Sequence, residues 1–170
     1  MSGTVTLIAR TAPLERELRM SSRIATAEDT ARLGELYFSA YDPGAGSENP
    51  QSADADVRAY LSGQFGTYLP EASPVALNDD GEIIAAVMVV ERATYEDTPD
   101  APFILELFTD RDHRRRGLAE QLVLASMDAL FNAGYKEVAL QVDETNSAAL
   151  ALYLSLDFRR WSPDADDLAD

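Results

Sequence analysis

An arginine-rich turn stands out from an otherwise acidic chain. Asp110–Glu120 reads DRDHRRRGLAE, and its three consecutive arginines occur in a protein of formal net charge −16. We expect a strand to end and a helix to begin here, and a helix start presents unpaired backbone N–H groups at its positive dipole end. Gly117 would let an anion approach the backbone, and the small side chain of Ala119 would leave room beside the anion. The turn therefore predicts an anion site, with a solvated basic helix start as the alternative.

A second pattern lies about one helix and one strand further along the chain. Leu140–Phe158 reads LQVDETNSAALALYLSLDF, and Asn146 is placed to begin a helix. Ala149 and Tyr153 follow on the same face of that helix. Because Tyr153 stands among leucines, its hydroxyl needs a polar partner. By itself, this pattern also fits a core tyrosine behind an ordinary helix cap.

The composition limits the chemistry. The 170 residues suffice for one domain, cysteine is absent, and His113 is the only histidine. Disulfides, thiolate nucleophiles, a serine–histidine–aspartate hydrolase and a multi-histidine metal site are therefore not expected, and we predict no metal. The acidic balance disfavours nucleic acid and anionic membranes and favours a cationic substrate, although solubility or base-composition bias also explains it. Without an apolar run of about 18 residues or a secretory leader, we expect a cytoplasmic protein.

Strands and helices are expected to alternate around these patterns. Apolar and β-branched runs predict strands at 4–10, 20–25, 75–77, 82–90, 103–109, 138–142 and 158–161. Helical spacing predicts helices at 27–40, 53–65, 116–132 and 147–156. Thr26 is expected to cap the first helix with Asp29 as its partner, 15–19 to form a helical turn, and 42–49 and 93–101 to form loops. This order predicts an α/β (α+β) domain around one mixed sheet.

Together, the two patterns resemble the GNAT superfamily of N-acetyltransferases. That family has an Arg/Gln-x-x-Gly-x-Gly/Ala turn after its fourth strand, then an Asn, an Ala, a Leu-Tyr and a Gly-Phe after its fifth. The matching residues here are Arg114, Gly117 and Ala119, followed by Asn146, Ala149, Leu152, Tyr153 and Phe158. The likeness covers residues 20–161. It implies a single GNAT-like domain with a central mixed, mostly antiparallel sheet flanked by about four helices.

The resemblance also implies an acyltransferase that moves the acetyl group of acetyl-CoA directly to a primary amine. The acceptor would be a small cationic molecule or a peptide or protein amine. In the family, the pantetheine arm pairs with the backbone of the fourth strand, the pyrophosphate lies on the turn, and the asparagine contacts the cofactor arm. The implied cofactor contacts are Leu107, Phe108, Thr109, Arg114, Arg115, Arg116, Gly117, Leu118, Ala119, Glu120 and Asn146.

Acetyl transfer needs a neutral amine, a polarised carbonyl and a proton for the leaving sulfur. The resemblance implies that Tyr153 supplies that proton. Glu106 lies on the strand where some members place a catalytic carboxylate, so we expect it to be the general base, with an exposed ion-pair partner as the alternative. Gln141 stands where other members use a glutamate and cannot accept a proton. Asp143 and Glu144 are nearby substitutes.

The chain departs from the family pattern at two points. Asp157 replaces the glycine before the phenylalanine, and the chain ends soon after Trp161, where many members add another strand. We expect the strand at 4–10 to fill that gap or to pair in a homodimer. The resulting division is an N-terminal extra strand and connector (1–19), an acetyltransferase domain (20–161) and a disordered acidic tail (162–170). The alternative to an enzyme is a non-catalytic acyl-CoA-binding regulatory module, which Gln141 favours.

Overall fold

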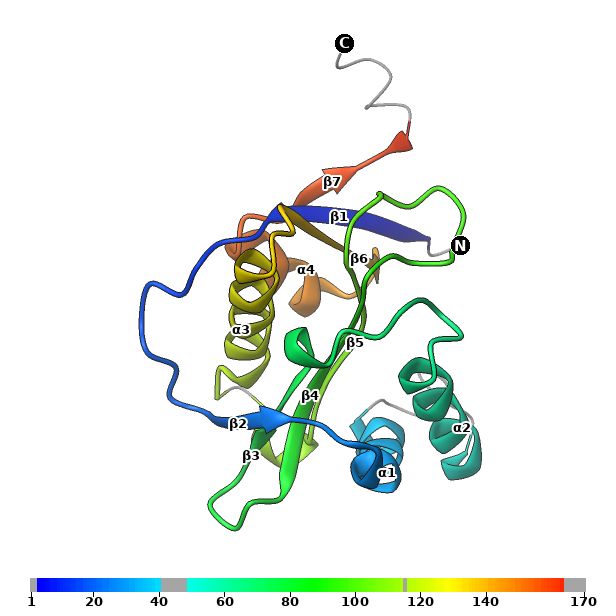
Figure 1. Cartoon of the computed structure of the whole chain (residues 1–170), viewed down its shortest axis with the longest axis vertical. Coiled ribbons are helices and arrows are strands. Elements are labelled where there is room, and N and C mark those ends of the chain that lie inside the picture. The colour runs from blue at the N-terminus through cyan, green and yellow to red at the C-terminus, as the bar shows by residue number, and fades with distance from the viewer. Residues whose placement is uncertain (1–2, 41–48, 115, 164–170) are drawn as a thin grey trace.

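The computed structural model describes residues 3–40, 49–114 and 116–163, which form one mixed sheet with helices on both faces (Figure 1). The helices are α1 (Thr30–Ala40), α2 (Pro50–Leu61), α3 (Leu118–Asn132) and α4 (Ser147–Ser155). The strands are β1 (Thr4–Arg10), β2 (Ser21–Ile24), β3 (Pro74–Leu77), β4 (Ile83–Val90), β5 (Phe103–Thr109), β6 (Glu137–Asp143) and β7 (Arg159–Trp161). Short 3-10 helices occupy Ala27–Asp29, Pro70–Ala72 and Arg111–His113. The predicted α/β domain is therefore present in the described residues.

The sheet has the order β2-β3-β4-β5-β6-β1-β7, and β5 and β6 form its parallel pair. The N-terminal strand β1 lies inside the sheet, antiparallel to β6 over seven residue pairs and to β7 over three. In Figure 1, β1 lies along the upper part of the molecule, with β7 beside it. The strand at 4–10 thus pairs with the strands of its own chain.

Two apolar clusters lie on opposite faces of the sheet. Helices α3 and α4 cover one face, and α1 and α2 cover the other (Figure 1). Strand β4 is buried along its full length and supplies both clusters, with Val87 in the first and Met88 in the second. This alternation is what a central strand buried on both faces requires. The α1–α2 pair is thereby held against β5 from one side and the α3–α4 pair from the other.

The entry into α1 follows the predicted capping arrangement. The N–H of Thr26 donates to Oδ2 of Asp29 at 2.8 Å, and the guanidinium of Arg23 donates to the same carboxylate at 2.7 and 2.9 Å. The hydrogen bond from Arg23 is the main cause that lowers the pKa of Asp29 to about 2. Because this pKa lies below its ordinary value, the interaction stabilises the fold at neutral pH and is lost only as the pH falls toward that value.

The connector between β1 and β2 differs from the prediction. Residues 15–19 form bends and irregular backbone where the sequence predicts a helical turn. The N–H groups of Arg19 and Met20 instead donate to Oε1 of Gln121 in α3, at 2.7 and 2.8 Å. A tertiary partner therefore replaces the local hydrogen bonds of a helix. The predicted tail beyond residue 163 and most of the loop predicted at 42–49 lie outside the described residues.

Two helix starts are also shifted. Helix α2 begins at Pro50 instead of residue 53, because the Asn49 side chain caps it and proline suits the first helical position. Helix α3 begins at Leu118 instead of residue 116, because Gly117 has φ +76° and cannot belong to the helix. This shift places the glycine in the cap position, where its backbone borders the predicted anion site.

Candidate active site

Strands β5 and β6 separate and open a cavity between them. They pair only through Phe103 with Ala139 and Ile104 with Leu140. On the other side of β5, Met88 of β4 pairs with Glu106 and Val89 pairs with Ile104. Leu105 is therefore a bulge in β5. A cavity of about 530 Å³ lies where the strands diverge. The side of β5 that faces this cavity lies outside the sheet pairing, so its backbone can pair with a ligand.

A second cavity, of about 680 Å³, extends from this opening to the start of α3. Its wall contains every predicted cofactor residue except Arg115, which lies outside the described residues, and Arg116, which is exposed nearby. The two cavities share the wall residues Leu107, Asn146, Ala149 and Tyr153. The residues that the sequence predicts for cofactor contact thus come together along one continuous wall.

The start of α3 has the geometry of an anion site. The carbonyl of Gly117 accepts the N–H of Gln121 at 3.1 Å, so the N–H groups of Leu118, Ala119 and Glu120 precede the helical hydrogen bonds. No side chain caps this end among the described residues. A Cβ on residue 117 would meet only the Gln121 side chain, at 3.8 Å. Glycine is therefore required here by the left-handed backbone and not by close packing.

Arg111 and Arg114, which precede α3, also donate hydrogen bonds to α1. The guanidinium of Arg114 donates to the carbonyl of Ala40, and Nε of Arg111 donates to the carbonyl of Ser39 at 2.8 Å. Both carbonyls lie in the last described turn of α1. Arg114 also borders the second cavity. Its charge thus lies between the end of α1 and the predicted phosphate site.

Asn146 and Tyr153 lie on one face of α4, as predicted. The side-chain oxygen of Asn146 accepts the N–H of Ala149 at 3.2 Å and caps the helix. Tyr153 packs on Phe158, with ring centroids 5.5 Å apart, and no hydrogen bond of its hydroxyl is found among the described residues. Burial, followed by the negative charge of Glu106, raises the pKa of Tyr153 above its ordinary value. The phenol therefore stays protonated at neutral pH, as a general acid must.

The turn after α4 keeps a conformation that favours glycine. Asp157 has φ +68°, in the left-handed region where aspartate is tolerated better than most residues. The N–H of Phe158 reaches back to the carbonyl of Tyr153 at 3.0 Å. The substitution noted in the sequence is therefore accommodated without loss of the turn that holds the tyrosine.

Glu106 contacts two tyrosines of α1 and α2, on the face of the sheet opposite α4. The hydroxyl of Tyr60 donates to its Oε2 at 2.9 Å, and the hydroxyl of Tyr37 is 3.3 Å from the same atom. Glu106 also borders the cavity between β5 and β6, together with Tyr153. The predicted base and acid thus share one cavity. Tyr37 and Tyr60 are not among the predicted site residues, although a buried phenol signals a polar partner.

The two substitute carboxylates and Gln141 each make other contacts. Oδ1 of Asp143 accepts the N–H and the hydroxyl of Thr145 at 2.8 and 2.6 Å and closes the turn after β6. Glu144 lies 3.8 Å from Arg160, on the side of β7. Nε2 of Gln141 donates to the hydroxyl of Thr6 in β1 at 3.3 Å. Asp143 borders the cavity, so it remains the nearest substitute for Glu106.

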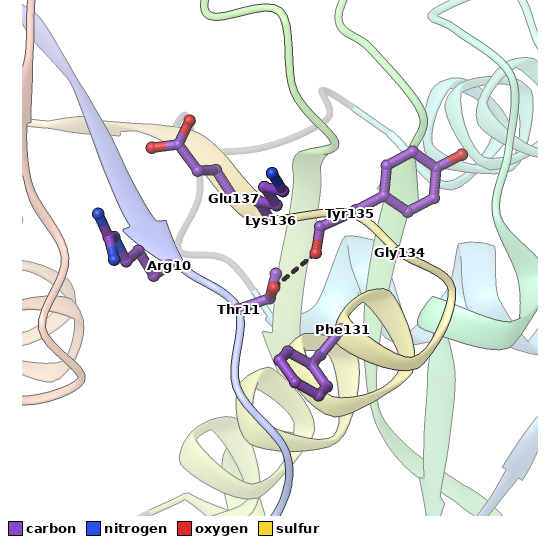
Figure 2. Close-up of a pocket in the computed structure, with 7 residues that line it drawn as sticks. All are labelled: Arg10, Thr11, Phe131, Gly134, Tyr135, Lys136 and Glu137. Carbon is purple, nitrogen blue, oxygen red and sulfur yellow. Dashed lines mark hydrogen bonds between the residues drawn. The ribbon is translucent and has the colours of Figure 1, made fainter.

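Other features of the described residues do not compete with this site. They contain no group of three acidic or histidine side chains arranged to hold a metal ion, and none of their helices is long and apolar enough to cross a membrane. A separate cavity of about 660 Å³ lies at the far end of α3. There the hydroxyl of Thr11 donates to the carbonyl of Tyr135 at 2.6 Å, and Figure 2 shows the residues that line the cavity. Arg10, Lys136 and Glu137 line it, and no predicted site residue does.

Comparison with known proteins identifies similar sequences. The sequence profile of the Acetyltransferase (GNAT) family matches residues 31–158. N-alpha-acetyltransferase 30 of Schizosaccharomyces pombe is 32% identical over 102 residues, which make up 60% of this chain and 67% of that protein. The family expectation that arose from the two sequence patterns is thereby confirmed.

Solved structures confirm the GNAT-like fold. A GCN5-related N-acetyltransferase from Sphaerobacter thermophilus superposes with a TM-score of 0.69 at 18% identity, covering 95% of this chain and 49% of that chain. The aminoglycoside N-acetyltransferase AAC(6')-Iy, in complex with CoA, superposes with a TM-score of 0.63 at 21% identity, covering 86% and 91%. This chain thus spans about half the length of the first structure, and identities at this level show the fold alone.

Proposed function

Because the chain belongs to the acetyltransferase (GNAT) family, we propose that it is an N-acetyltransferase that moves the acetyl group of acetyl-CoA directly to a primary amine. One observation carries the proposal. Two cavities share part of their wall. One reaches the start of α3, which suits a phosphate group, and the other reaches the carboxylate of Glu106, which suits an ammonium group. Tyr153 lies in the wall that they share. The acceptor is a small cationic molecule or a peptide amine.

Acetyl-CoA fits the second cavity by the chemistry of its wall. The N–H groups of Leu118, Ala119 and Glu120 would hold the pyrophosphate, aided by the charge of Arg114. The backbone of Leu107–Thr109 would pair with the amides of the pantetheine arm, because this side of β5 is outside the sheet. The thioester then reaches the opening between β5 and β6, where Glu106 and Tyr153 meet.

The reaction moves three protons, because two leave the nitrogen and one reaches the leaving sulfur. An amine with a pKa of about 10.4 is mostly protonated at neutral pH, and freeing it costs roughly 4–5 kcal/mol. Glu106 attracts the ammonium group and accepts its proton, after which the amine nitrogen bonds to the acetyl carbon. As the carbon–sulfur bond breaks, the phenol of Tyr153 gives its proton to the CoA thiolate, and the second proton of the nitrogen passes to the tyrosinate. Glu106 then releases its proton to solvent. The products are the acetylated amine and free CoA.

A non-catalytic acyl-CoA-binding module is not favoured. Such a module has no need for a carboxylate and a protonated phenol at the same opening, whereas acetyl transfer uses both. The missing glutamate at Gln141 does not remove the base, since Glu106 from the neighbouring strand lines the same cavity. The alternative would regain support if the protein bound acetyl-CoA without acetylating any member of a broad amine panel.

The test compares Tyr153→Phe and Glu106→Gln with the unchanged protein in a CoA-release assay. Each substitution removes one proton-transfer group, so kcat should fall about 100-fold or more while the Kd for acetyl-CoA stays unchanged. Tyr135→Phe, at the far end of α3, serves as the matched control and should leave both quantities unchanged. An unaltered kcat in Tyr153→Phe would show that another group protonates the thiolate.

A further inference from the structure

Three elements far apart in the sequence meet at one carboxylate oxygen. Tyr37 of α1 and Tyr60 of α2 both direct their hydroxyls to Oε2 of Glu106 in β5, at 3.3 and 2.9 Å. The tyrosines are nearly buried, with 7% and 8% of their surfaces exposed. Charge-assisted hydrogen bonds of this kind are stronger than those between neutral groups. Helices α1 and α2 are thus joined to β5 by a polar contact inside an apolar layer.

The two phenol rings have little freedom to move. The ring of Tyr37 lies 5.4 Å from that of Phe108 and 6.5 Å from that of Tyr60, measured between centroids. Tyr60 in turn packs edge-on against Phe65, at 5.2 Å. Because the rings are held by their neighbours, their hydroxyls are held too. Two donors on one oxygen therefore restrict the rotation of the carboxylate about its last bond.

This network is not sealed inside the core. Glu106 also borders the cavity between β5 and β6, on whose wall Tyr153 lies. Burial is the main cause that raises the pKa values of Tyr60 and Tyr153, and the charge of Glu106 raises both further. The same carboxylate is therefore close to phenols on both sides of the sheet. A purely structural contact would not need to reach the cavity.

We propose that Tyr37 and Tyr60 are positioning residues, which orient Glu106 so that its carboxylate receives the acceptor's ammonium group. The inference rests on the proposed role of Glu106 as base. Helices α1 and α2 carry neither the proposed base nor the proposed acid, but their tyrosines would set the orientation in which Glu106 accepts the proton. It also predicts that the phenol hydroxyls act only through Glu106 and have no effect of their own on acetyl-CoA.

The experiment measures Tyr37→Phe and Tyr60→Phe in two backgrounds, the unchanged protein and Glu106→Gln. Each change removes one hydroxyl and keeps the ring. In the unchanged background, loss of a hydrogen bond to a charged group should lower kcat about tenfold, with the larger effect at Tyr60. The KM for acetyl-CoA should not move. In the Glu106→Gln background, the same substitutions should cause almost no further loss of kcat.

Tyr135→Phe is the matched control, since Tyr135 is also near a carboxylate, that of Glu91, but outside the site. Urea unfolding of every variant identifies any loss that comes from misfolding. Equal losses of kcat in both backgrounds would overturn the positioning role, because the hydroxyls would then act independently of Glu106. A protein without acetyl transfer to any amine would instead overturn the proposed function, and the positioning role with it, so the two failures are distinguishable.

Discussion

The two cavities of the proposed active site are built in different ways: the cofactor end lies at the start of α3, and the acceptor end lies at Glu106. At the cofactor end, the consecutive residues from Leu118 to Glu120 present backbone N–H groups at the start of one helix. At the acceptor end, Tyr37, Tyr60 and Glu106 come from two helices and a strand and meet through side chains. A backbone site tolerates changes in most side chains, whereas a side-chain site depends on each member. The cofactor end should therefore be common to related folds, and the acceptor end should decide which amine is used.

Removal of β1 should have the largest effect, because it disturbs both ends. This strand buries Leu7 and Ile8, and each buried aliphatic side chain contributes about 1.5–3 kcal/mol. It also pairs along all of β6, next to the turn that carries Asn146. A domain is stable by only about 5–15 kcal/mol, so deletion of residues 1–12 should lower the urea midpoint sharply and abolish acetyl-CoA binding.

Thr6→Val provides the matched control for this deletion. It removes the hydroxyl that accepts from Gln141 and keeps the strand, so the protein should remain folded and should bind acetyl-CoA. A shortened protein with an unchanged urea midpoint and unchanged binding would show that β6 does not need β1. In that case the two ends would be independent of the N-terminal strand.

Local signals explain which parts could be predicted. Gly117 and Asn146 mark helix starts through their own backbone preferences, so the cofactor residues follow from a short stretch of sequence. Tyr60 and Glu106 are 46 residues apart in the sequence. Strands β1 and β6 are more than a hundred residues apart, as the contact between Thr6 and Gln141 shows. Neither leaves a local pattern. The sequence predicts the helices that carry these tyrosines, but tertiary packing alone brings their hydroxyls to the carboxylate.

Gly117→Val should damage the cofactor end alone. A side chain in the left-handed region costs about 1–2 kcal/mol of stability, and the added methyl groups border the predicted pyrophosphate site. Affinity for acetyl-CoA should fall about tenfold or more, which corresponds to roughly 1.4 kcal/mol or more of binding free energy. The kcat measured at saturating acetyl-CoA should change little, because Glu106 and Tyr153 are untouched. Calorimetric titration and steady-state kinetics give the two quantities.

Gly134→Val controls for the backbone strain. Gly134 follows the other end of α3 with φ +94° and open space around it, so valine there should destabilise the fold by a similar amount. Its affinity for acetyl-CoA should be that of the unchanged protein. If both variants weakened binding equally, the loss at Gly117 would come from general destabilisation, and the start of α3 would not be the pyrophosphate site.

A change in ionic strength should have the smallest effect, and it should not raise the KM for acetyl-CoA as it raises the KM for a cationic amine. With a net charge of −16, the protein attracts a cationic acceptor and repels acetyl-CoA at long range. Raising the salt from about 0.01 to 0.15 M shortens the screening length from about 30 to 8 Å. The KM for a cationic amine should then rise by about threefold, while the KM for acetyl-CoA should fall or stay constant. A dicationic amine should respond more strongly than a monocationic one. If the KM for the cationic amine did not rise, the acceptor end would owe its preference to contacts within the cavity and not to the charge of the surrounding surface.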